Sequence, residues 1–251
     1  MSEKLARRAP TPRKGVRARA AVMLAAGLSA AAGLAFVADR KDPTAPAASG
    51  KPTLMLLTTL PLVFGESFGL DGGGSPALKA LETRYSVTPI GVADAGTLAR
   101  GRLLLMAHPL AQPAEALVDL DRWVREGGRL LLLADPALEW HSERPLGDAL
   151  RPPPAFADTG LLRHWGLRLD APDERGPRQL EFGGQAILTA SPGSLAGTCA
   201  ISKDRLVARC RIGKGEATIV ADADFLNVAD LDGPTANNLN AMLAELAALE
   251  R

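Results

Sequence analysis

Residues 102–136 are RLLLMAHPLAQPAEALVDLDRWVREGGRLLLLADP, and this stretch decides the fold. Leu103–Ala107 and Leu130–Ala134 are continuous apolar runs of strand length, typical of strands buried on both faces of a parallel sheet. Between them, Pro113–Glu126 has apolar residues at helical spacing, and Gly127-Gly128 follows as a helix terminator. A strand, a helix and a strand at this spacing predict a right-handed βαβ crossover.

The same alternation precedes this unit. Pro52–Val63 is an apolar run of strand length, and Ser86–Val92 is a second, shorter strand. Between them Pro76–Tyr85 is expected to be helical, with Ser75 as its N-cap and proline at the first helical position. Alternating strands and helices predict a three-layer α/β domain with a mostly parallel sheet.

After residue 137 the regular alternation of strands and helices no longer continues in the sequence. A polar, proline-rich excursion over the surface is expected at Leu138–Pro154, followed by a short helix at Thr159–Trp165 and a final helix at Ala236–Leu249. From Gln179 the periodicity predicts short β segments, at Gln179–Phe182, Ala186–Ala190, Thr198–Ile201, Leu206–Ile212 and Ala217–Ala221.

The N-terminus has the pattern of a membrane anchor. Ala20–Ala38 contains no charged residue, and its nineteen residues would reach about 28 Å as a helix, close to the thickness of a hydrocarbon core. Residues 1–19 carry seven Lys or Arg and one acid, a flank that stays cytoplasmic. We therefore expect a basic cytoplasmic tail at 1–19, a transmembrane anchor at 20–38, a Pro/Ala-rich linker at 39–51 and an extracytoplasmic domain at 52–251.

Two other interpretations of this segment stay open. A cleaved signal peptide has a shorter apolar region, of about 7–15 residues, and sequence does not decide whether this segment is cleaved. A buried alanine-rich helix in a cytosolic protein is disfavoured by the basic flank and the linker. The favoured location is the inner membrane of a Gram-negative-type cell, with a single pass through Ala20–Ala38, the N-terminus inside and the C-terminal domain in the periplasm.

The charge of the chain divides at the same place. The whole chain has 29 basic and 28 acidic residues. Residues 1–38 contain seven of the basic residues and one of the acidic residues, so residues 39–251 contain 22 basic and 27 acidic residues. A mildly acidic domain without a basic stripe argues against nucleic acid as a partner. With only 4% aromatic residues, a stacking platform for bases or sugars is also disfavoured.

Cys199 and Cys210 are the only cysteines. They flank two β segments around a turn at Asp204-Arg205, and counting outward from that turn places the cysteines opposite each other. Directly opposite residues in an antiparallel pair are close enough for a disulfide, and an exported compartment preserves the bond. The alternative is two reduced, buried thiols. A metal site is disfavoured, because two thiols without a neighbouring histidine or carboxylate make a poor ligand set.

Several residues near strand ends are candidates for ligand binding. Ser67 lies in a G-x-S-x-G pattern, but a loop rather than a helix follows it, which disfavours a nucleophile elbow. Asp71 and Gly73 belong to a glycine-rich loop before a helix N-terminus, where backbone N–H groups could hold an anion. His108 and Asp135 follow buried strands, at the edge where open α/β sheets bind ligands.

A polar cluster follows the last predicted strand. Asp222 and Asp224 begin it, and carboxylates grouped in this way can bind a hard cation. Such residues also cap helices and fix loops, and we favour that structural role. No metal and no cofactor is therefore expected.

Residues 102–136 resemble the strand–helix–Gly-Gly–strand–Asp-Pro core of two related families. One is the auxiliary domain of gliding-motility-type ABC transport systems, and the other is a membrane-anchored bacterial family of unknown function. The ending RIGKGEATIVADADFLNVADLDGPTANNLNAMLAELAAL, residues 211–249, is similar to their G-x-G, strand, D-x-D-F-x-N and N-N-x-N helix. The resemblance covers most of residues 52–249.

The resemblance implies a flavodoxin-like or class I glutamine amidotransferase-like fold. The amidotransferase requires a cysteine at a strand-to-helix elbow, and neither Cys199 nor Cys210 follows a buried strand in this way. The resemblance therefore implies that this chemistry is absent, and it supplies no catalytic residue.

Three functions follow from these observations. The favoured one is a non-enzymatic, membrane-anchored periplasmic accessory or binding domain that acts through membrane-protein or envelope partners, such as the subunits of an ABC-type transport system. The second is a hydrolase or ligand-binding enzyme that uses Ser67, His108 and Asp135. The third is a structural spacer.

Overall fold

The computed structural model describes residues 50–63 and 74–251. The predicted tail at 1–19, the predicted anchor Ala20–Ala38 and nearly all of the predicted linker lie outside this part. Within the described residues, none of the helices has both the length and the apolar character needed to cross a bilayer.

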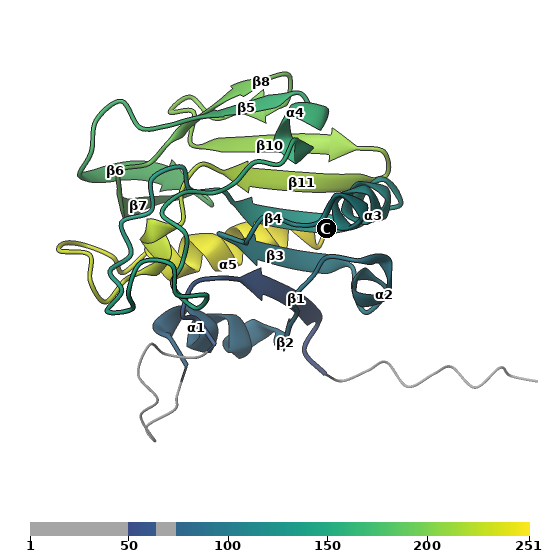
Figure 1. Ribbon diagram of the computed structural model, residues 1–251, viewed down its shortest axis with the longest axis horizontal. Coiled ribbons are helices and arrows are strands. Elements are labelled where there is room, and N and C mark those ends of the chain that lie inside the picture. Colours follow the sequence, from purple (N-terminus) through teal and green to yellow (C-terminus); the bar gives the residue numbers. More distant parts are fainter. Residues whose placement is uncertain (1–49, 64–73) are drawn as a thin grey trace, which may run out of the picture. The chain divides into compact units, whose positions relative to one another are not determined.

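A seven-stranded sheet forms the centre of the domain (Figure 1), with the strand order β2-β1-β3-β4-β11-β10-β9. The first five of these strands run parallel to one another, while β10 is antiparallel to both β11 and β9. The predicted α/β fold with a mainly parallel sheet is thus confirmed. The strands are β1 (Thr53–Thr58), β2 (Ser86–Pro89), β3 (Leu103–Ala107), β4 (Arg129–Leu133), β9 (Ala200–Ile201), β10 (Val207–Ile212) and β11 (Gly215–Val220).

Helices cover both faces of the sheet, because its central strands are apolar on both sides. Leu105 and Leu133 face one hydrophobic cluster, whereas Leu104 and Leu132 face the other. The first cluster is closed by α1 (Pro76–Arg84) and α5 (Asn238–Leu249). The second is closed by α2 (Ala95–Leu98), α3 (Ala114–Arg125) and α4 (Leu161–His164).

The ends of α1 and α3 follow from local sequence. Ser75 caps α1, its Oγ atom accepting a hydrogen bond from Leu78 N at 3.0 Å, as predicted. Gly127 follows α3 with a φ of 115°, which a residue with a side chain rarely adopts. A Cβ atom on Gly128 would lie 2.4 Å from Trp123, so the close approach of the helix to the next strand requires glycine there.

Two small antiparallel sheets of two strands each accompany the main sheet. One pairs β5 (Leu167–Asp170) with β8 (Ser194–Gly197), and the other pairs β6 (Pro177–Phe182) with β7 (Gln185–Ala190). The sequence did not predict β8, because four residues with serine and glycine carry no alternation and the strand depends on pairing with β5. For the same reason it did not predict α2 or the short 3₁₀ helix η1 (Asp224–Leu226).

The predicted excursion covers the carboxyl ends of the parallel strands. Leu138 N donates to Pro154 O at 3.0 Å, and Phe156 N donates to Asp135 O at 2.6 Å. Figure 1 shows this segment in teal, passing the ends of β3 and β4. The polar residues that follow these strands therefore lie under a loop.

The predicted hairpin register is confirmed. Ala200 pairs with Arg209 and Ile201 with Ala208, and the disulfide between Cys199 and Cys210 joins Cα atoms 4.9 Å apart. The turn is longer than the predicted two residues. The last hydrogen bond between the two segments runs from Ser202 N to Val207 O, and Arg205 adopts a left-handed φ of 62°. Counting outward from Asp204-Arg205 gives the right register because the longer loop is centred on the same two residues.

Candidate functional site

Three buried carboxylates meet at the carboxyl ends of β4 and β11. Leu133 pairs with Val220 in the parallel register, so Asp135 and Asp222 each follow two residues beyond this pair. Asp224 lies at the start of η1. Each of the three side chains has an oxygen within 4.8 Å of the others, and they are 0%, 0% and 2% exposed, in the order Asp135, Asp222 and Asp224.

Asp135 connects the two strand ends through backbone groups. Its Oδ1 atom accepts a hydrogen bond from Ala137 N at 2.8 Å, and its Oδ2 atom accepts one from Ala223 N at 2.9 Å. A carboxylate that receives such bonds is held firmly, and it satisfies N–H groups that would otherwise be buried without a partner.

In each of the other two carboxylates, the hydrogen bonds reach a single oxygen. Asp224 Oδ2 accepts a hydrogen bond from Glu139 N at 2.8 Å. Asp222 Oδ1 accepts from the hydroxyl of Thr189 on β7 and from Phe225 N, the latter at 3.2 Å. Asp222 Oδ2 receives no hydrogen bond from any described residue, although it is completely buried.

Burial and mutual repulsion disfavour the charged forms of these groups. Burial raises the pKa of Asp135 to about 6. Burial, with the nearby charge of Asp135, raises the pKa of Asp224 to about 8. The pKa of Asp222 is raised well above its ordinary value by burial and by the charges of Asp135 and Asp224.

A fourth carboxylate, that of Glu139, lies next to this cluster and is exposed to solvent. Its charge contributes to the raised pKa values of Asp135 and Asp224. It accepts a hydrogen bond from the hydroxyl of Ser191. Glu139 therefore marks the side from which a small ion could reach the buried oxygens.

His108 lies at the end of β3 but is not hydrogen-bonded to Asp135. Its ring Nε2 is 2.8 Å from Pro153 O, its Nδ1 has no partner among the described residues, and the side chain is completely buried. Burial lowers the pKa of His108. The neutral imidazole of His108 thus donates a hydrogen bond from Nε2 to Pro153 O, which helps to hold the segment Leu138–Pro154 over the strand ends.

The remaining predicted ligand residues, Ser67, Asp71 and Gly73, lie outside the described part of the chain. Among the described residues, the structure brings Asp135, Asp222 and Asp224 together, and His108 holds a separate position. The cluster offers oxygen atoms to a proton or to a hard cation, but the three side chains are buried and present no open face for an organic substrate within the part of the chain that the structure describes.

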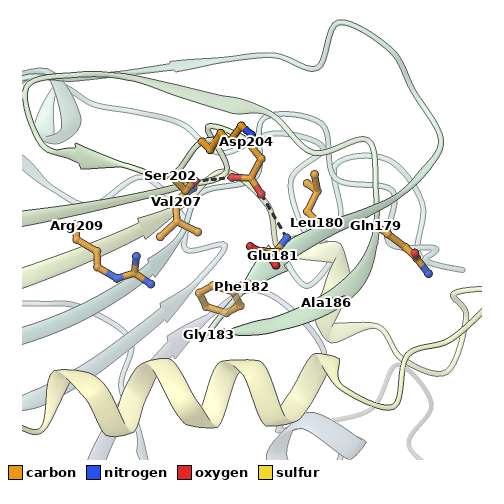
Figure 2. A pocket seen from close by; sticks show the side chains of 12 residues that line it. Gln179, Leu180, Glu181, Phe182, Gly183, Ala186, Ser202, Asp204, Val207 and Arg209 are labelled. Carbon is orange, nitrogen blue, oxygen red and sulfur yellow. Dashed lines mark hydrogen bonds between the residues drawn. The ribbon is translucent and has the colours of Figure 1, made fainter.

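A groove of about 600 Å³ opens elsewhere, between the β6–β7 hairpin and the turn at Ser202–Asp204 (Figure 2). Leu180, Phe182 and Val207 supply apolar lining, and Arg209 lies at one end. Arg209 is held by two hydrogen bonds to the buried carboxylate of Glu245 on α5, at 2.8 and 2.6 Å.

One wall of the groove is a free strand edge. Leu188 lies opposite Gln179 in the hairpin, yet its N–H and C=O bond to Asn238 rather than to Gln179. This pair is therefore a non-hydrogen-bonded one, and the backbone N–H and C=O of Gln179 point away from β7. Two residues along, Glu181 N points the same way and donates to Asp204 Oδ2 at 3.3 Å, as drawn in Figure 2.

No sequence pattern predicts the groove. Its two walls belong to separate hairpins, and no local pattern indicates that Gln179 and Asp204 lie on the same surface. The alternation of Gln179–Phe182 was the one available signal, since it indicates a strand with one exposed face.

Comparisons with known proteins give structural likenesses only. Neither a scan against protein-family models nor a search of curated proteins finds a match. Among solved structures, an exo-β-1,4-mannosidase from Opitutaceae bacterium strain TAV5 is 14% identical over 80% of this chain and 36% of its own, with a TM-score of 0.46. A β-galactosidase from Bacillus circulans sp. alkalophilus is 16% identical over 79% and 31%, with a TM-score of 0.44.

The N-terminal domain of mmIFT52 is 12% identical over 78% of this chain and 97% of its own, with a TM-score of 0.49. This chain spans about a third of the length of the two glycosidases. Identities and TM-scores this low do not identify a shared function. The resemblance to the auxiliary domain of ABC transport systems stays a prediction.

Proposed function

We propose that this chain is a non-enzymatic, membrane-anchored periplasmic accessory protein whose domain binds an extended segment of an envelope protein. The observation that carries the proposal is the contrast between two surfaces. The strand-end edge, where α/β enzymes place their chemistry, is covered over the described residues, while the groove beside β6 is open.

The free edge of β6 determines the kind of partner. Gln179 presents an N–H and a C=O that no other described residue pairs, and these groups match the backbone of another strand. Leu180 is partly exposed and offers apolar surface to side chains of that strand, while Phe182 and Val207 line the groove at 2% and 1% exposure. Strand addition with alternating side-chain contacts is a recurrent way of binding extended polypeptides.

The cysteines support the proposed location. Cys199 and Cys210 form a disulfide, and disulfides persist in exported proteins while they are rare in the cytosol. The basic tail and the apolar run Ala20–Ala38 support insertion with the domain outside. An ABC-type transport system or another envelope assembly is the proposed context, on the resemblance described above.

A hydrolase that uses Ser67, His108 and Asp135 is less well supported. Asp135 directs both oxygens to backbone N–H groups, and His108 directs Nε2 to a backbone carbonyl. Both side chains are completely buried, so neither faces a substrate.

Site-specific photocrosslinking tests the proposal. A photoreactive amino acid replaces Gln179 in the groove or, as the control, Val118, which is 58% exposed on α3 and lies on the other side of the sheet. We expect the full-length chain in cells to crosslink to an envelope protein from position 179 and not from position 118. Equal crosslinking at both positions, or none at 179, would overturn the proposal.

A matched pair of variants tests strand addition itself. Gln179→Pro removes the outward N–H without breaking the hairpin, and Pro177 already occupies the equivalent position two residues earlier. Gln179→Ala keeps the N–H. With the photoreactive residue moved to Lys203 across the groove, Gln179→Pro should lower the crosslink yield at least tenfold and Gln179→Ala should preserve it. Equal yields in the two variants would contradict edge addition.

A further inference from the structure

The cluster of Asp135, Asp222 and Asp224 contains an oxygen that lacks a partner. Asp222 is completely buried, and its Oδ2 atom accepts no hydrogen bond among the described residues. Two further ionisable carboxylates, Asp135 and Asp224, have oxygens within 4.8 Å. A buried carboxylate in such surroundings requires a proton or a cation to offset the cost of desolvation and repulsion.

Backbone contacts hold the other two carboxylates in place. Asp135 is fixed by Ala137 N and Ala223 N, and Asp224 by Glu139 N. Neither side chain can turn away to reduce the repulsion without leaving these N–H groups unpaired. The arrangement therefore keeps one oxygen of each carboxylate within 4.8 Å of the other two, as a preorganised ligand set does.

The spacing of the oxygens sets an upper bound on their distance from a shared cation. For three atoms that all lie within 4.8 Å of one another, there is a point no farther than about 2.8 Å (4.8/√3) from each. Ca²⁺ binds oxygen at 2.3–2.6 Å and accepts irregular geometry, whereas Mg²⁺ requires about 2.0–2.1 Å and a near-octahedral set. At that bound, binding of Ca²⁺ requires a smaller movement of the three oxygens than binding of Mg²⁺.

We propose that Asp135, Asp222 and Asp224 bind a calcium ion, which enters from the side of Glu139 and links the ends of β4 and β11. This site is separate from the groove beside β6, so its presence does not depend on the proposed partner binding. It also revises the expectation from sequence that the chain binds no metal. Hard oxygen donors favour Ca²⁺ over softer transition metals that prefer nitrogen or sulfur.

Calcium titration of the purified full-length chain in mild detergent tests the proposal. After removal of divalent ions with EDTA, isothermal titration calorimetry with CaCl₂ should give one saturable site per chain, and the same titration with MgCl₂ should give an affinity at least tenfold weaker. Calcium should also raise the midpoint of thermal unfolding. Absence of saturable Ca²⁺ binding to the wild-type chain at millimolar concentration would overturn the proposal and indicate that protons neutralise the cluster.

Two isosteric variants assign the binding to this cluster. Asp222→Asn keeps the acceptor for Thr189 and Phe225 N and removes the charge, and it should weaken calcium binding at least tenfold. Asp232→Asn removes an exposed carboxylate and should leave the calcium affinity unchanged. If Asp222→Asn does not fold, Asp224→Asn replaces it. Calcium affinity unchanged in a folded cluster variant would contradict the site.

Discussion

Asp135 Oδ2 accepts a hydrogen bond from Ala223 N at 2.9 Å, across 88 positions of sequence. The bond joins the end of β4 to the end of β11, two strands that are adjacent only because the sheet brings them together. It explains why an aspartate occupies the end of an otherwise apolar strand. Beyond the last backbone hydrogen bond between β4 and β11, the carboxylate of Asp135 accepts hydrogen bonds from N–H groups that would otherwise be buried without a partner.

Removal of this acceptor should destabilise the fold. Asp135→Asn places an N–H donor opposite Ala223 N or Ala137 N, so in EDTA it should lower the free energy of unfolding by about 1–3 kcal/mol. Asp222→Asn should cause no loss in EDTA, because the atom that it replaces has no backbone partner and the substitution relieves repulsion. Urea denaturation of both variants measures the difference, and equal losses would contradict the distinct roles of the two residues.

The disulfide should make a measurable contribution to stability. Cys199 and Cys210 are 11 positions apart, and a loop of this size restricts the unfolded chain by about 2–3 kcal/mol. The double variant Cys199→Ser/Cys210→Ser should lose this amount, and treatment of the wild-type chain with a reducing agent should have the same effect. An unfolding midpoint that does not respond to reduction would contradict this contribution.

Asn238 should be among the most sensitive polar positions. Its Oδ1 accepts from Leu188 N at 3.0 Å, and its Nδ2 donates to Leu188 O at 2.7 Å and to Phe225 O at 2.8 Å. Asn238→Ala leaves these buried groups without partners, so a loss of about 3 kcal/mol or more is expected. Asn240→Ala, at an exposed position on the same helix, is the control and should cost less than about 1 kcal/mol. Similar losses at both positions, measured by urea denaturation, would refute the assigned role.

His108 should make the domain sensitive to mild acid. Burial lowers its pKa in the folded state, while the unfolded chain takes up the proton at about pH 6.5. The contribution of the neutral ring is therefore complete above that pH and is lost as the pH falls toward the folded-state pKa. Relative to His108→Gln, the wild-type chain should lose up to about 1.4 kcal/mol per pH unit below pH 6.5. If the free energy of unfolding depends on pH in the same way for the wild-type chain and for His108→Gln between pH 7 and 5, the assigned role of His108 is wrong.

The sequence predicted the βαβ unit well because its signals are local. The predicted strand Leu103–Ala107 coincides with β3, and the predicted helix exceeds α3 by one residue at each end. Apolar runs, a helical stripe and the glycines after α3 each act within a few residues. The four-residue elements β8 and α2 were missed, since tertiary contacts rather than their own composition determine them.

The sequence predicted individual residues of the candidate site but not that they lie close together. Asp135 and Asp222 were each identified as residues that follow a buried strand. Their proximity required the knowledge that β11 pairs with β4. Leu133 and Val220 are register partners although 87 positions separate them (220 − 133), and no periodic pattern specifies such a neighbour. The groove beside β6 could not be predicted, because its walls come from two hairpins whose contact depends on the whole fold.

The central claim is that this domain works outside the cytoplasm, and cysteine labelling tests it most directly. Leu110→Cys places a thiol at a position that is 53% exposed in the domain, and Ser2→Cys places one in the basic tail. In intact spheroplasts of a Gram-negative host, a membrane-impermeant maleimide should label the first variant, while the second should be labelled only after lysis. Protection of the cysteine at position 110 until the cells are lysed would contradict the account.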